Sequence, residues 1–437
     1  MGPLVTGVLA FVVMIFIALL GVPIFVAMGM VGLVGLIFSS GVSPAIGTVA
    51  SLPFAVFANY GLAVVPLFFL MGAFVGEGGV TQDAFGSAYK LLGKIRGGLA
   101  MATSIGSGLS AATMGSSVAN AALFTRMAYP EMSKYGYDKS FSLGCIASAG
   151  TFAIMIPPSI AFVIYGIITG ESIGKLLIAG VLPGILTVIV YLIAIWTMAR
   201  LNPRLAPPPP VTFTGREKLR AVFGLWTVAL LFLLVIGGIY SGLFTPSQAG
   251  AVGAFGALVI AVGRRKITKA SLTMIAVGSV EGMSALSVVI LGGFILMRFL
   301  VLSGFVDEVV SFVDIARISP VGILIGVVIL YLILGALMDE LSMTVCTIPF
   351  IYPIMMKLGY NGIWFGVVYT KLCQIGLIFP PVAMNLFVVA ASAGEDTTVV
   401  DVIKGIWPFI VLEVIVLTLL ILFPSISLFL PDMMYGR

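Results

Sequence analysis

Apolar runs of membrane-crossing length recur along the chain from Leu4 to Leu430, and only short polar stretches separate them. A helix needs about 20 mainly apolar residues to cross a bilayer. The runs at 4–20, 23–38, 221–240 and 247–263 meet or approach this length. The pattern therefore predicts an all-α, polytopic membrane protein whose apolar runs are its spans.

Two parts of the sequence repeat one another. The segment Pro130–Tyr137 returns as Pro353–Tyr360, 223 residues later. Each copy leads through an apolar stretch into a double proline, Pro157-Pro158 in the first and Pro380-Pro381 in the second. Helix breaks at corresponding places in two halves are typical of transporters built from repeats.

Charge orients these repeats and separates them. Most of the 22 lysines and arginines fall in four clusters, at 90–96, 126–139, 200–220 and 264–269. Because positively charged loops stay in the cytoplasm, we place all four clusters on that side. The third cluster overlaps a run of four prolines and predicts a stiff cytoplasmic linker at 201–220, between a first repeat at 1–200 and a second at 221–437.

Each repeat is predicted to contain a re-entrant helical hairpin. Both ends of 97–126 lie in cytoplasmic clusters, and its return from Ser117 to Phe124 is too short to cross the membrane. The segment therefore turns back near Gly115. The second hairpin, 318–357, turns near Asp339 and enters from the opposite side, which makes the two repeats inverted.

Further helices complete the predicted repeats. Broken helices surround the two proline pairs, at 140–170 and 361–394. Segment 81–96 gathers apolar residues on one helical face and is predicted to lie along the cytoplasmic interface. We expect the hairpins to move against a scaffold that includes the spans 176–198 and 399–423.

The double prolines are predicted to free backbone carbonyls inside the membrane. Pro157 and Pro158 cannot donate to the carbonyls of Ala153 and Ile154, and the second pair frees the carbonyls of Gly376 and Leu377 in the same way. Unpaired carbonyls are costly at this depth unless something binds them, and a desolvated Na⁺ takes hard oxygen ligands. Alternatively, the prolines only kink packed helices, and nearby hydroxyls bond back to their own turn.

Small polar residues at the hairpin tips complete two predicted sodium sites. The first site is predicted to comprise Thr113, Gly115, Ser116, Ser117, Asn120, Gly150, Ala153, Ile154, Met155 and Pro157. The second is predicted to comprise Asp339, Ser342, Thr344, Gly376, Leu377, Phe379 and Pro380.

Four charged residues lie in apolar surroundings, where charges are expensive and usually functional. Asp339 and Glu340 could attract a cation at the second hairpin tip, or they could cap a helix N-terminus. Arg298 and Lys371 could hold an anionic substrate, or they could pair with Asp339 or Glu340.

Composition excludes several other classes of protein. The chain is 60% hydrophobic and 9% charged. Its net charge of +5 does not indicate nucleic-acid binding, because the basic residues lie in short loops between spans. It contains no histidine, and its three cysteines are too scattered for a metal cluster. No cofactor other than Na⁺ is expected.

Several motifs together resemble a known family. They are Met114–Asn120, Tyr129–Met132, Ile156–Ile160, Leu334–Asp339, Gly376–Pro381 and Asn385–Phe387. They are similar to motifs of the large membrane subunit of tripartite ATP-independent periplasmic (TRAP) transporters, and the likeness covers almost the whole chain. Ser159 and Asn385, which lie in these motifs, join Arg298 and Lys371 as substrate candidates. The chain departs from the family at Asn120, where Asp is common, and at Met155 and Phe379.

The resemblance implies a Na⁺-driven, elevator-type importer of an organic acid in the bacterial inner membrane. Its partners would be a small four-helix membrane subunit and a periplasmic substrate-binding protein, and its surroundings membrane lipid. Two other functions stay open on the sequence. One is a stand-alone sodium–anion symporter of related architecture. The other, a membrane-embedded enzyme, has little support without histidine or a nucleophile–base pair.

Overall fold

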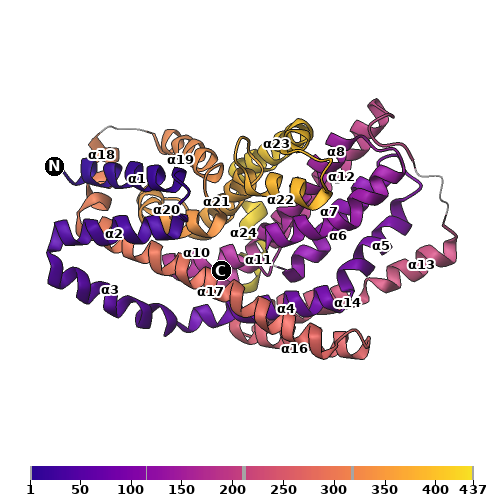
Figure 1. The fold of residues 1–437 in the computed structure, drawn as a ribbon, viewed down its shortest axis with the longest axis horizontal. Helices are drawn as coiled ribbons and strands as arrows, with labels where there is room; N and C mark the ends of the chain where they lie inside the picture. The colour runs from indigo at the N-terminus through magenta and orange to yellow at the C-terminus, as the bar shows by residue number, and fades with distance from the viewer. Residues whose placement is uncertain (1, 115, 209–212, 316–318, 436–437) are drawn as a thin grey trace.

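The computed structural model describes residues 2–435 except 115, 209–212 and 316–318, and it describes no side chain at 112–114, 312–315 or 435. All regular structure in the described residues is helical, as the sequence predicts. Among the described residues, six helices are long and apolar enough to cross a membrane, or seven if the bent pair Lys139–Met155 and Ile160–Thr169 counts as one span. Figure 1 shows α1 to α3 and α18 at one end of the molecule, and α5 and α13 at the other.

One group of helices forms a scaffold around the long helix α17, which packs against α2, α3 and α4. Its first members are α1 (Pro3–Leu19), α2 (Ile24–Ser40), α3 (Val42–Phe57), the 3₁₀ turn η1 (Tyr60–Ala63) and α4 (Val64–Glu77). Its later members are α13 (Gly215–Gly224), α14 (Trp226–Phe232), the π-helical turn η2 (Leu233–Gly237), α15 (Gly238–Tyr240), α16 (Pro246–Gly263), α17 (Lys269–Leu302) and α18 (Phe305–Ile315).

The other group, the core, contains the hairpins and broken helices. From the first half it takes α6 (Gly98–Met114), α7 (Ser117–Lys134), α8 (Lys139–Gly150), α9 (Phe152–Met155), α10 (Ile160–Thr169), α11 (Ile173–Ala179) and α12 (Val181–Leu201). From the second half it takes α19 (Pro320–Gly335), α20 (Glu340–Lys357), α21 (Gly362–Gly376), α22 (Met384–Ala393), α23 (Val399–Leu422) and α24 (Ser425–Tyr435). The same series of hairpin and broken helix is thus built twice.

The two halves exchange parts of their broken helices. The second arm of the first broken helix, α10, packs against α20 and α21 of the second half. The second arm of the second broken helix, α22, packs against α7 and α8 of the first half. Each hairpin therefore lies beside a helix contributed by the other half, and the core is built from both halves together.

Three predicted boundaries are wrong. The return arm α7 does not end near 126 but continues to Lys134, because Pro130 is accommodated within the helix. Helix α13 begins at Gly215, inside the predicted linker, because Thr214 and Glu217 form a capping box there. The amphipathic helix α5 (Val80–Leu92) ends before 96 and buries its apolar face against α6 and α13.

The expected place of two spans is also wrong. Helices α12 and α23, which we assigned to the scaffold, pack against each other and against core helices α6, α8 and α21.

Glycines set the crossing of α23 with α8, since a Cβ on Gly405 would overlap the carbonyl oxygen of Ser140. A Cβ on Gly144 of α8 would likewise lie only 2.3 Å from the carbonyl oxygen of Gly405, so the two backbones touch.

This crossing predicts that Gly405→Ala destabilises the protein. The added methyl group must push α23 away from α8, and overpacking of this kind costs roughly 1–3 kcal/mol. The melting temperature of the purified chain measures the effect. Gly47→Ala is the matched control: Gly47 lies within α3, and a methyl group added there would meet nothing within 4 Å. Since alanine favours a helix over glycine, this variant should melt at the temperature of the parent protein or above it. Equal melting of both variants would contradict the crossing.

Candidate functional site

Both proline pairs lie where a helix is interrupted. The first pair separates α9 from α10, and the two arms meet at an angle of 42°. The second pair separates α21 from α22. Of the predicted ligands, Ala153, Ile154 and Met155 form the buried end of α9, and Gly376 is the last residue of α21. Pro157, Leu377, Phe379 and Pro380 lie in the breaks themselves.

The two breaks differ in how their carbonyls are satisfied. In the second, the carbonyl of Leu377 accepts from the backbone N–H of Asn385 (3.2 Å), and that of Gly376 from the N–H of Phe379 (3.2 Å). The expectation that both are free is therefore wrong, because the chain after the prolines folds back and supplies donors. In the first break, the carbonyls of Ala153 and Ile154 accept no turn or loop hydrogen bond from the described backbone.

Asn120 of the first hairpin reaches the end of α8 beside the first break. Its Nδ2 donates to Ser107 Oγ (2.9 Å), to the Ser107 carbonyl (3.3 Å) and to the Gly150 carbonyl (3.3 Å). Its Oδ1 is buried and finds no hydrogen-bond partner within the described part of the chain. Gly150 allows this approach, since a Cβ there would lie 2.6 Å from that of Ala121. Three oxygens thus converge on one amide nitrogen.

The tip of the first hairpin also contacts the second half of the chain. Asn385 of α22 donates from Nδ2 to Ser117 Oγ (2.7 Å) and to the carbonyl of Ala147 (3.3 Å), and all three residues are buried. The sequence analysis predicted Ser117 as a cation ligand and Asn385 as a substrate candidate, in two different sites. The structure brings them together. Gly115 lies outside the described residues, as does the side chain of Thr113.

At the second hairpin, Asp339 caps α20. Its Oδ1 accepts from the N–H groups of Leu341 (3.0 Å) and Ser342 (2.9 Å), and its Oδ2 accepts from Ser342 Oγ (2.5 Å). Thr344 donates to the carbonyl of Glu340 (2.5 Å) and accepts from the hydroxyl of Tyr369 (2.7 Å). The capping alternative therefore describes Asp339. Asp339 and Ser342 bond to each other, and Thr344 is bonded to Glu340 and Tyr369, so the polar side chains predicted as ligands at this tip already have partners.

Gln374, which the sequence reading missed, connects the two breaks. Its Nε2 donates to the carbonyl of Thr151 (2.9 Å), the residue that lies 223 positions earlier. Its Oε1 has no partner among the described residues. A lone amide side chain in the apolar run before the second proline pair is the signal that could have identified it.

Unpaired buried oxygens gather around these breaks. Within the described residues, four of them lie on the first hairpin or the broken helices, namely Asn120 Oδ1, Ser159 Oγ, Thr370 Oγ1 and Gln374 Oε1, whereas those of Tyr89, Ser279 and Ser427 lie elsewhere. Buried polar atoms almost always have a partner, so such a group indicates a site for a bound ion, water or ligand. Of the substrate candidates, Ser159 belongs to this set, whereas Arg298 is exposed on α17 and makes no ion pair with the described residues.

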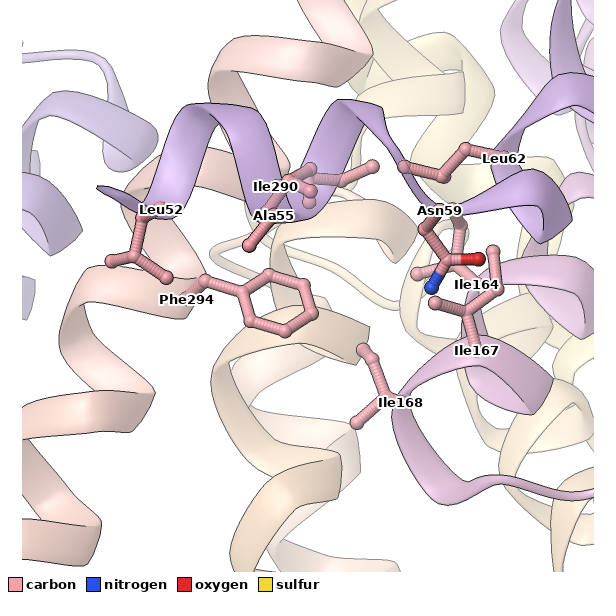
Figure 2. Close-up of a pocket in the computed structure, with 10 residues that line it drawn as sticks. Leu52, Ala55, Asn59, Leu62, Ile164, Ile167, Ile168, Ile290 and Phe294 are labelled. Atoms are coloured by element: carbon pink, nitrogen blue, oxygen red, sulfur yellow. The ribbon is translucent and has the colours of Figure 1, made fainter. Parts of the chain in front are cut away.

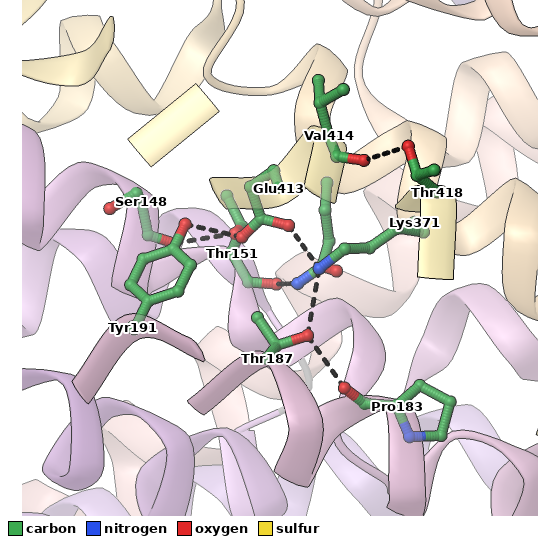
Figure 3. A network of polar contacts seen from close by, with 10 residues as sticks. Ser148, Thr151, Pro183, Thr187, Tyr191, Lys371, Glu413, Val414 and Thr418 are labelled. Carbon is green, nitrogen blue, oxygen red and sulfur yellow. Dashed lines mark hydrogen bonds and ion pairs between the residues drawn. The ribbon is translucent and has the colours of Figure 1, made fainter. Parts of the chain in front are cut away.

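Lys371 does not pair with Asp339 or Glu340. It forms an ion pair with Glu413 of α23, and both side chains are fully buried (Figure 3). Glu413 was missed as a buried charge, although it is the one acidic residue in the middle of the apolar run 402–422.

Two cavities lie at the boundary between core and scaffold. One of about 440 Å³ lies at the first hairpin tip, where Ser116 and Ala119 face Glu77 of α4 and Ser279 of α17. A smaller one of about 150 Å³ lies between α3, α10 and α17 and is lined by apolar side chains apart from Asn59 (Figure 2). By contrast, α20 of the second hairpin packs directly on α17, where Val345 fills the space beside Gly293.

Comparison with known proteins assigns the chain to a family. Residues 11–426 match the model of the DctM component of the tripartite ATP-independent periplasmic transporters. The chain belongs to this family. It is 35% identical to the C4-dicarboxylate TRAP transporter large permease protein DctM of Pseudomonas aeruginosa over 86% of this chain and 87% of that protein. It is 31% identical to the DctM protein of Vibrio cholerae over 98% of each. It is 32% identical to the sialic acid TRAP transporter permease protein SiaT of Haemophilus influenzae, over 86% of this chain and 60% of that protein.

A solved structure shares the fold. The transporter YdaH of Alcanivorax borkumensis superposes with a TM-score of 0.54 at 15% sequence identity, over 89% of this chain and 90% of that one. The solved structure supports the fold alone. The family match and the relatives confirm the predicted identity as a TRAP large membrane subunit, which is a transport protein and not an enzyme.

The cap on α20 predicts different effects for two changes at Asp339. Asp339→Ala removes the acceptor of two backbone N–H groups and should lower the free energy of unfolding by about 1 kcal/mol, whereas Asp339→Asn keeps an acceptor and should cost much less. Thermal melting of both variants measures this. If Asn were as harmful as Ala, the charge of Asp339 and not its capping would be what matters.

Proposed function

We propose that this TRAP large permease subunit imports an organic acid across the bacterial inner membrane, driven by a Na⁺ gradient. The observation that carries the proposal is the group of unpaired buried oxygens at the two helix breaks, together with the free carbonyls of Ala153 and Ile154. Buried oxygens that no described donor reaches suit a small hard cation.

The first break is the better of the two candidate sodium sites. There the three oxygens around the amide of Asn120 already converge, and a half-turn of that amide would replace its nitrogen with Oδ1. Four oxygens would then face one another, and a cation bound between them would replace the lost N–H donors. The second site would draw on Gln374 and Thr370 rather than on the carbonyls of Gly376 and Leu377, which are already paired.

The substrate site is proposed beside these cations, at the first hairpin tip. Ser116 faces the large cavity, while the second hairpin is packed against the scaffold. Gln82, which belongs to the segment predicted to lie along the cytoplasmic interface, also lines this cavity, so the arrangement corresponds to a state that releases substrate to the cytoplasm. Apolar side chains line the boundary at α10 (Figure 2), which suits a core that slides as a unit in an elevator mechanism.

Substrate class and partners come from the relatives. Those reported above are named for C4-dicarboxylates and for sialic acid, which are organic acids. A tripartite transporter implies a small membrane subunit and a periplasmic binding protein, and we propose both as partners of this chain. The binding protein would select the substrate before the membrane subunits receive it.

Na⁺ coupling predicts that uptake into proteoliposomes of the complete complex stops when choline replaces Na⁺ outside. Asn120→Ala should raise the Na⁺ concentration for half-maximal uptake by about tenfold, since one lost ligand of this kind costs on the order of 1.4 kcal/mol. Thr197→Ala is a matched control, because Thr197 is exposed and donates only to the carbonyl of Ile193 in its own helix. Unchanged uptake in choline would contradict the proposal.

The tripartite assignment predicts no uptake by this chain alone. Proteoliposomes with the chain should become active only when the small membrane subunit and a loaded binding protein are both added. Uptake by the chain alone would instead favour a stand-alone sodium–anion symporter.

A further inference from the structure

A fully buried charge network lies between three core helices. Lys371 of α21 is paired with Glu413 of α23, and neither side chain has any exposed surface. Two residues of α12, one turn apart, complete the network (Figure 3): Tyr191 donates to Glu413 Oε1 (2.6 Å), and Thr187 Oγ1 accepts from Lys371 Nζ (3.0 Å). Each charged group therefore has both its counter-ion and a neutral hydrogen-bond partner.

Such a network is not needed for stability. Apolar residues of similar volume would usually hold three helices together at least as well, because the charges must first be desolvated. The charges instead specify how the helices are aligned, because the pair and its hydroxyl partners are satisfied in only one register of α21 against α12 and α23. Sliding or rotating α21 by one residue would leave two charges unpaired inside the protein.

The register of α21 is also what places the helix breaks. Gln374 lies one turn after Lys371 and donates to the Thr151 carbonyl beside the first break. α21 ends at Gly376, where its backbone touches that of Gly335 in α19. A Cβ on Gly376 would lie 2.6 Å from the Cα of Gly335, so little movement is tolerated there.

We propose that Lys371 and Glu413 are positioning residues, which lock α21 against α12 and α23 and so hold Gln374 and both helix breaks in place. Lys371 itself contacts no substrate. The consequence for transport rests on the Na⁺ coupling proposed above, whereas the effect on the position of α21 does not depend on it.

The test compares Lys371→Met with the neutral pair Lys371→Met/Glu413→Gln, in which Tyr191 keeps its acceptor. The single variant leaves Glu413 charged and unpaired, so it should melt at a lower temperature, and the neutral pair should recover much of that loss. Both should raise the Na⁺ concentration for half-maximal uptake at least about threefold, because neighbouring groups couple by this much or more. If the pair had a purely structural role, the neutral pair would regain the Na⁺ dependence of the parent protein together with its stability.

A second readout needs neither Na⁺ nor transport. Cys373 is buried on α21, two residues from Lys371. In a background with Cys145→Ala and Cys346→Ala, maleimide labelling of Cys373 in Na⁺-free buffer should be about tenfold faster in both variants, because α21 opens more often. If uptake by the parent protein turned out not to depend on Na⁺, the proposed function would be refuted, but the labelling experiment would still test the position of α21.

Thr418→Ala is the matched control for the same helix. Thr418 lies on α23 close to Glu413, is exposed, and donates only to the carbonyl of Val414 (2.8 Å). It should change neither labelling nor Na⁺ dependence. A neutral pair with the labelling rate and Na⁺ dependence of the parent protein would overturn the proposal.

Discussion

Two proline pairs remove backbone donors from helices in the middle of this membrane protein, and the core is arranged around the carbonyls they leave behind. In the absence of water, each such carbonyl must find a donor or a cation. At the second break the chain folds back, and Asn385 and Phe379 supply the donors. At the first break no described backbone group does so, and Asn120 is held beside it with its own oxygen unpaired. The two helix breaks, although similar in sequence, therefore differ in how their carbonyls are satisfied.

The exchange of arms between halves follows from the same constraint. A broken helix exposes backbone at its ends, and a hairpin tip can cover only one side of it. By placing α22 against α7 and α8, and α10 against α20 and α21, each half covers the break of the other. The buried network of Lys371, Glu413, Thr187 and Tyr191 then fixes one of these broken helices in register.

Much of the fold could be predicted because its signals are local. Proline lacks a donor wherever it occurs, so Pro157 and Pro380 locate the breaks without any knowledge of the fold. The charge clusters at the ends of 97–126 and its short return arm locate the first hairpin in the same way. The sequence could not predict which helices pack against each other, because an apolar run does not indicate which of its faces contacts which neighbouring helix. The ion pair of Lys371 with Glu413 and the close contact at Gly405 join helices that are distant in the sequence, so no local signal indicates that α12 and α23 belong to the core.

The site was predicted in part for a related reason. Residue type identified Asn120, Ser117 and Asp339 as polar groups near the breaks, but it could not show that Asp339 is used as a cap or that Leu377 is paired. Gln374 gave only the weak signal of one amide in an apolar helix.

The most direct measurement of the central claim is the melting temperature of the purified chain as NaCl replaces choline chloride at constant ionic strength. Binding of Na⁺ to the folded state alone raises stability with the logarithm of its concentration above the dissociation constant. We expect a saturable dependence on Na⁺ that Asn120→Ala weakens and that K⁺ does not reproduce. The same melting temperature in Na⁺, K⁺ and choline would contradict the account.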